Sequence, residues 1–136
     1  MHEVDGPLAV LERRRRCVIA RDMDAFADLF AADGVIEIPF AANGLPTRLA
    51  GREAIREFTA RSGRRPLEIT DLRTVQVHRT LDPEVVIMEL VTVGRVTTTG
   101  QSFEVPCVQV FRIRDGQILL FRDHVGTLAM PDLSAA

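Results

Sequence analysis

The chain has 136 residues, 46% hydrophobic and 26% charged, with 17 basic against 19 acidic side chains. This length suits a single domain, which we expect to span residues 1–136 with a core over about 8–128. The balanced charge argues against nucleic-acid binding, and no apolar run approaches the ~20 residues of a membrane span. The N-terminus lacks the pattern of a secretory signal. We therefore expect a cytoplasmic protein that binds neither nucleic acid nor membrane.

Residue types that are absent exclude several chemistries. Every basic residue is arginine, so no lysine can form a Schiff base, and no tyrosine or tryptophan is present. Cys17 and Cys107 match no metal-binding spacing, and the three histidines do not cluster. We expect neither a metal nor a cofactor.

The first third of the chain has helical periodicity, and the remainder alternates with the period of a strand. Asp5-Gly6-Pro7 is typical of a helix start, and the Asp-Gly of residues 115–116 is typical of a hairpin turn. In chain order, the pattern predicts helices at 7–21 and 23–32, a turn at Asp33-Gly34, a strand at 35–40, a loop at 41–50, a helix at 51–62, and strands at 67–79, 84–98, 102–114 and 117–127.

Helices followed by an antiparallel meander indicate an α+β domain. The segment 84–93 is apolar on both faces: Val85, Ile87 and Val91 share one face, and Val86, Met88 and Leu90 share the other. Three helices can cover only one face of the sheet. We therefore expect a homodimer formed through the sheet.

The last predicted strand contains the main candidate for chemistry, Asp123. Alternation places this carboxylate on the same face as Leu119, Phe121 and Val125, with Ile118 and His124 on the opposite face. A carboxylate on an apolar face has a raised pKa, which suits a general acid or base. The alternative is an Asp at the end of a strand that pairs with a surface arginine.

Other polar residues on apolar faces are candidates for binding. Gln109 is the only polar residue on its face of the preceding strand, so it needs a hydrogen-bond partner. Four consecutive arginines, residues 13–16, cannot all face water from one helix, and either Arg14 or Arg15 lies at the centre of the apolar stripe. Glu89 is either an acid at the dimer interface, paired with arginine, or a second carboxylate in a pocket.

Three segments together resemble the nuclear-transport-factor-2-like superfamily, whose members include ketosteroid isomerase, SnoaL-like polyketide cyclases and limonene epoxide hydrolase. They are ARDMDAFADLFAADGVIEIPF, LAGREAIREF and VQVFRIRDGQILLFRDHV. The resemblance implies a conical, cystatin-like roll: three N-terminal helices packed in a curved, mostly antiparallel sheet that is usually dimeric. It also implies that Asp123 matches the aspartate that serves as acid or base on the last strand of the cyclases and epoxide hydrolases.

The match to the isomerase chemistry is incomplete. Ile38 stands where ketosteroid isomerases have their aspartate base, Arg14 lies near the position of their oxyanion tyrosine, and Gln109 near that of their oxyanion aspartate. The Arg-x-Asp pair of the epoxide hydrolases corresponds to Leu90-Val91-Thr92. A true ketosteroid isomerase is therefore not expected.

The sequence is compatible with two functions. In the first, a metal-free enzyme uses Asp123 for acid–base proton transfer on an apolar substrate that contains oxygen, while Arg14 and Gln109 stabilise negative charge on that oxygen. In the second, the cone is a non-catalytic module that holds an apolar ligand. In both, the expected apolar wall consists of Ile36, Ile38, Phe40, Phe58, Phe111 and Phe121.

Overall fold

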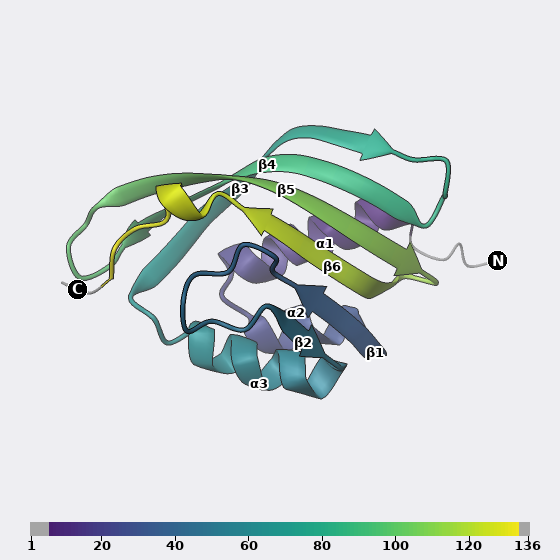
Figure 1. Ribbon diagram of the computed structural model, residues 1–136, viewed down its shortest axis with the longest axis horizontal. Coiled ribbons are helices and arrows are strands. Elements are labelled where there is room, and N and C mark those ends of the chain that lie inside the picture. The colour runs from purple at the N-terminus through teal and green to yellow at the C-terminus, as the bar shows by residue number, and fades with distance from the viewer. Residues whose placement is uncertain (1–5, 134–136) are drawn as a thin grey trace.

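The computed structural model describes residues 6–133. One sheet has the strand order β2-β1-β6-β5-β4-β3, in which β1 and β6 are parallel and every other neighbouring pair is antiparallel (Figure 1). The elements are α1 (Pro7–Ile19), α2 (Met23–Asp28), β1 (Phe30–Glu37), β2 (Arg48–Ala50), α3 (Arg52–Ser62), β3 (Leu67–Arg79), β4 (Val85–Val96), β5 (Ser102–Arg114), β6 (Gln117–Val125) and the 3-10 turn η1 (Thr127–Ala129). The α+β cone expected from the sequence is confirmed.

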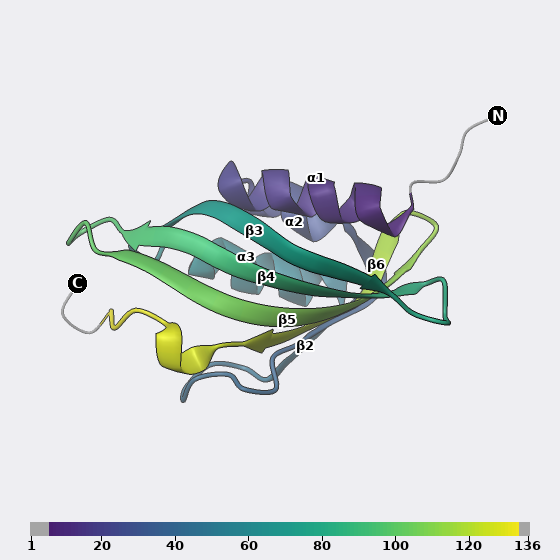
Figure 2. The same ribbon diagram turned by 90° about the horizontal axis from the view of Figure 1, so that it is seen from above.

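The helices occupy the inner side of the curved sheet, and α1 runs along it beside β3 (Figure 2). Strand alternation turns one set of side chains toward these helices, and that set forms the core. The largest side chains under 2% exposed are Phe30, Phe111, Ile55, Leu90, Ile118, Val10, Val86, Val96 and Val105. The core therefore lies between the helices and the middle of the sheet.

The long strands lie where the sequence predicts them. β3 and β5 have the predicted bounds, and β4 and β6 differ from theirs by at most two residues at each end. The turn between β5 and β6 has positive φ at both Asp115 (52°) and Gly116 (75°). These values match the type I′ hairpin that Asp-Gly favours.

The segment after the second helix differs from the prediction. α2 ends at Asp28 and β1 begins at Phe30, so Asp33-Gly34 lies inside the strand as an irregularity in its pairing with β6. A Cβ at Gly34 would lie 2.9 Å from the carbonyl oxygen of Ile118, so glycine permits this close approach. The predicted loop at 41–50 ends in the short edge strand β2.

The predicted face of Ile118 was also wrong. Arg112 pairs with Leu120 but Ile113 pairs with Ile118, which leaves Leu119 as an extra residue in β6. A bulge of this kind shifts the alternation by one position. Ile118 is therefore fully buried in the core, on the same side as Phe121 and Asp123.

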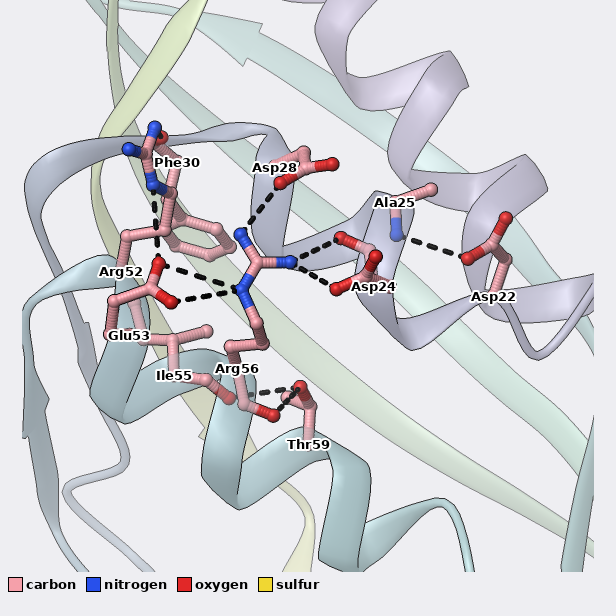
Figure 3. Close-up of polar contacts among 10 residues, drawn as sticks. All are labelled: Asp22, Asp24, Ala25, Asp28, Phe30, Arg52, Glu53, Ile55, Arg56 and Thr59. Atoms are coloured by element: carbon pink, nitrogen blue, oxygen red, sulfur yellow. Dashed lines mark hydrogen bonds and ion pairs between the residues drawn. The ribbon is translucent and has the colours of Figure 1, made fainter.

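Arg56 connects α3 to α2 (Figure 3). Its guanidinium donates to Asp28 Oδ1 at 2.6 Å and to Glu53 Oε1 at 3.2 Å, and it also binds the carboxylate of Asp24. The hydrogen bonds that Arg56 donates to Asp28, Asp24 and Glu53 raise its pKa above the ordinary value. These contacts hold α3 against α2 at the base of the cone.

Within residues 6–133, every helix is too short or too polar to cross a lipid bilayer.

Candidate functional site

The candidate site is formed by residues from α1 and three neighbouring strands. Gln109 in the middle of β5 lies opposite Met88 of β4 on one side and Asp123 of β6 on the other. All three occupy inward positions of their strands. Arg14 reaches them from α1, where Val10, Leu11 and Arg14 are the buried residues.

Arg14 is a buried cation, 3% exposed. Its Nη2 donates to Gln109 Oε1 at 2.9 Å and approaches the sulfur of Met88 at 3.4 Å. The guanidinium carbon lies 5.1 Å from the ring centroid of Phe111 and 5.7 Å from that of Phe121, so two aromatic faces also contact the charge. Burial lowers the pKa of Arg14 to about 10, and the charge of Asp123 opposes this shift. Arg14 therefore stays positive at neutral pH.

Gln109 links this cation to the carboxylate. Because its amide oxygen accepts from Arg14, its NH₂ group is the side that can donate to Asp123. Burial raises the pKa of Asp123, and this hydrogen bond from Gln109 and the positive charges of Arg14 and His124 oppose the rise. Asp123 and Arg14 thus interact through Gln109 and through space, without a direct ion pair between them.

Two polar atoms in this group have no partner. Within the part of the chain that the structure describes, Oδ1 of Asp123 and Nε of Arg14 are both buried and form no hydrogen bond. Buried polar atoms are normally satisfied, and leaving one unpaired costs about 1–3 kcal/mol. One acceptor and one donor are therefore free inside the cone.

The expected apolar wall is only partly formed. Ile36, Phe111 and Phe121 are buried, and the two phenyl rings stack with centroids 4.7 Å apart. Ile38 packs against the core from a partly buried position.

The structure places Phe40 and Phe58 away from the buried polar group. Phe40 lies beyond the end of β1, is 60% exposed, and its ring centroid is 5.7 Å from that of His124. Phe58, on α3, lines an open hollow beside the 41–47 loop. Neither ring contributes to the wall around Asp123, because β1 ends at Glu37 and α3 lies at the base of the cone.

The structure decides two questions that the sequence left open: whether Arg14 or Arg15 points inward, and whether Glu89 lies in the pocket. Arg14 points inward, whereas Arg15 pairs with Asp71 at 2.6 Å, with both side chains more than a third exposed. Glu89 is not in the cone: it binds His78 at 2.6 Å on the outer face of the sheet.

Met88 is a site residue that the sequence did not reveal. Alternation placed it on the inner face, but its position beside Gln109 depends on the register of β4 with β5. A groove of about 100 Å³ between α1 and β3 reaches Arg14 and Met88. Within residues 6–133, no three potential metal ligands come together.

The sequence matches the SnoaL-like domain family over residues 11–121. It is 40% identical to the PhzA/B-like protein PA3332 of Pseudomonas aeruginosa over an alignment of 103 residues. This alignment covers 75% of this chain and 71% of that protein. A crystal structure of a Bacillus subtilis protein superposes with a TM-score of 0.85 at 26% identity, covering 95% of this chain and 92% of the other. The Mycobacterium tuberculosis protein Rv0760c, crystallised with estradiol-17β-hemisuccinate, gives a TM-score of 0.76 at 23% identity, covering 94% of this chain and all of the other. The chain therefore belongs to the SnoaL-like domain family, within the nuclear-transport-factor-2-like superfamily that the sequence resembles.

Proposed function

We propose that the protein is a metal-free acid–base enzyme that acts on an apolar small molecule containing a carbonyl or related oxygen. The observation that carries this proposal is the partly buried Asp123 carboxyl, whose Oδ1 is buried without a partner and whose pKa is raised, beside the buried Arg14 cation. An acid or base that works near neutral pH needs such a shift.

The proposed step is a proton transfer next to a carbonyl group. Oδ1 of Asp123 takes a proton from the carbon adjacent to the carbonyl, and the electron pair moves onto the carbonyl oxygen to form an enolate. The unpartnered Nε–H of Arg14 donates to that oxygen. Delivery of the proton to the γ-carbon of an unsaturated ketone completes an isomerisation. In a cyclisation, the enolate carbon attacks a second carbonyl group of the substrate, the π-electron pair of that group moves onto its oxygen, and this oxygen takes the proton from Asp123.

The substrate we propose is larger than the space now open beside Arg14. Pockets for drug-sized ligands enclose about 300–1,000 Å³, whereas the groove at Arg14 holds about 100 Å³. Side chains that fill the cone would therefore move when a ligand enters. Rv0760c was crystallised with a steroid ester, which supports an apolar ligand of that class for this cone.

Hydrogen exchange at carbon tests the proposed step without knowledge of the natural substrate. An apolar ketone such as β-tetralone is incubated with the protein in heavy water, and the loss of its α-proton signals is followed by NMR. We expect the wild type to accelerate exchange and Asp123→Asn to lower that acceleration about 100-fold or more. Glu89→Gln, which removes a carboxylate on the outer face, is the matched control and should exchange at the wild-type rate.

A non-catalytic binding module is the second candidate. The observation in its favour is Ile38, which stands where related isomerases have their base. If the ketone shifts the NMR signals of Phe111 and Phe121 and yet no variant changes the exchange rate, the protein binds ligand without turnover.

The outer face of the sheet supports the predicted homodimer. In the middle of this face, β4 presents Ile87 and Val91 around the His78–Glu89 pair, and β5 presents Val108, which is 41% exposed. A hollow of about 400 Å³ lies on this face between Val108 and the exposed ring of Phe40. We propose that a second copy of the chain covers this outer face. We also propose that the protein resides in the cytoplasm.

A charge placed in the middle of this face should prevent dimerisation. We expect the wild type to sediment as a dimer and Val108→Asp as a monomer, because a buried carboxylate without a partner opposes association. Leu81→Asp introduces the same charge in the β3–β4 turn, at a fully exposed position, and should remain dimeric. A wild type that sediments as a monomer would contradict the proposal.

A further inference from the structure

Four arginines surround the C-terminal end of α3, and their charges are not neutralised. Within the described chain, Arg61, Arg64 and Arg65 form no ion pair, and Arg21 forms a single side-chain hydrogen bond, at 3.3 Å to the carbonyl oxygen of Gly63. Most of the other arginines have acidic partners, as in the 2.7 Å pair between Arg95 and Glu68. This end of the molecule is therefore locally positive.

An apolar hollow opens beside these cations. It holds about 670 Å³, its apolar lining is formed by Leu45, Pro46, Leu49 and Phe58, and Arg61 and Arg65 lie at its edge. Figure 1 shows the loop between β1 and β2 passing the C-terminal end of α3, and residues 44–46 of this loop line the hollow together with Phe58 of α3. No aspartate or glutamate of the described chain lines it.

Arg65 indicates what this hollow binds. The partial negative charge at the end of α3 accounts for Arg61, which lies in the last helical turn. Arg65 lies beyond the helix, between the hollow and a second pocket of about 180 Å³, and its Nε is buried with no hydrogen-bond partner in the described structure. A guanidinium with a free donor beside an apolar surface matches an acid head group attached to an apolar body.

We propose that this hollow binds a free amphipathic anion, whose carboxylate lies between Arg61 and Arg65 and whose hydrocarbon part lies on Leu45, Leu49 and Phe58. The hollow has the volume typical of small-molecule sites. Its lining contains neither Arg14 nor Asp123, so the proposal does not depend on the acid–base chemistry.

The test compares decanoate, below its micellar concentration, with decanol as the neutral analogue, using titration calorimetry. We expect decanoate to bind the wild type and decanol to bind much more weakly. Arg65→Gln should weaken decanoate binding about tenfold or more, because a charge-assisted contact is lost. Arg79→Gln, which removes an exposed arginine at the far end of β3, should bind decanoate like the wild type.

A second variant tests the same proposal independently, in case Arg65→Gln does not fold. Leu45→Asp alters an exposed residue, 41% accessible, and places a carboxylate against the arginines, so it should also weaken decanoate binding. The proposal is overturned if Arg65→Gln and Leu45→Asp both bind decanoate like the wild type. It is also overturned if Asp123→Asn alone changes the affinity, which would locate decanoate in the cone. Binding to phosphatidylglycerol vesicles in the absence of decanoate binding would overturn it as well.

Discussion

Replacing Asp123 by asparagine should make the folded protein more stable at neutral pH while removing its proton-transfer activity. Burial raises the pKa of Asp123 above its ordinary value of 3.8, so the ionised carboxylate is less favourable in the folded protein than in the unfolded chain. Each unit of that rise corresponds to about 1.4 kcal/mol of folding free energy at neutral pH. Asparagine has nearly the same shape and no charge, so the variant avoids this cost.

The pH dependence of this gain has a definite sign. Below pH 3.8 the carboxyl is protonated in both the folded and the unfolded states, so the wild type and Asp123→Asn should be similar in stability. As the pH rises from there to the raised pKa, the folded state keeps the proton that the unfolded state releases. Wild-type stability therefore falls over this interval, and the advantage of the variant reaches a plateau above it.

Thermal unfolding of both proteins across this pH range measures the effect. Asp71→Asn is the matched control, because Asp71 is 37% exposed and paired with Arg15, so this change should not stabilise the protein at any pH. If Asp123→Asn were the less stable protein at neutral pH, Arg14 and Gln109 would be stabilising the anion. Asp123 would then be a structural carboxylate and not an acid or base with a raised pKa.

The α+β class and its strands could be predicted from local signals in the sequence, whereas the conical arrangement was implied by the resemblance to the superfamily. The period-2 pattern located β3 and β5 with their correct bounds, and Asp115-Gly116 located the hairpin between β5 and β6. The errors occurred where pairing overrides the local pattern. Asp33-Gly34 has the sequence of a turn, but the parallel pairing of β1 with β6 includes it in a strand.

The site was predictable as a list of residues but not as an arrangement. Alternation placed Gln109 and Asp123 on apolar faces, and the structure places both inside the cone. Their direct opposition, and the position of Met88 on the other side of Gln109, depend on strand register, which one sequence does not determine. Phe40 was misplaced because hydrophobicity alone does not reveal that β1 ends at Glu37.

Replacing Arg14 by methionine should raise the pKa of Asp123 further. Methionine fills much of the same volume but cannot donate, so Gln109 Oε1 loses the 2.9 Å hydrogen bond from Arg14. A buried acceptor left without a donor costs about 1–3 kcal/mol, whereas loss of the buried charge, whose pKa burial lowers to about 10, favours folding, so the two effects on stability oppose each other. The positive charge that opposes the rise in the pKa of Asp123 is also lost. NMR titration of the carboxyl carbon measures the change in the pKa of Asp123.

Arg15→Met is the internal control for this prediction, because it removes the adjacent arginine from the same helix. Arg15 and Asp71 form an exposed pair at 2.6 Å, and such pairs contribute about 0–1 kcal/mol. A raised Asp123 pKa in Arg14→Met beside an unchanged one in Arg15→Met would show that the buried guanidinium, and not the charge of the helix as a whole, acts on the carboxyl. If the pKa of Asp123 were unchanged in Arg14→Met, the cation would not be coupled to the carboxyl. The proposed stabilisation of an enolate by Arg14 would then fail, because a guanidinium without influence on a neighbouring carboxylate would have none on an oxyanion at the same site.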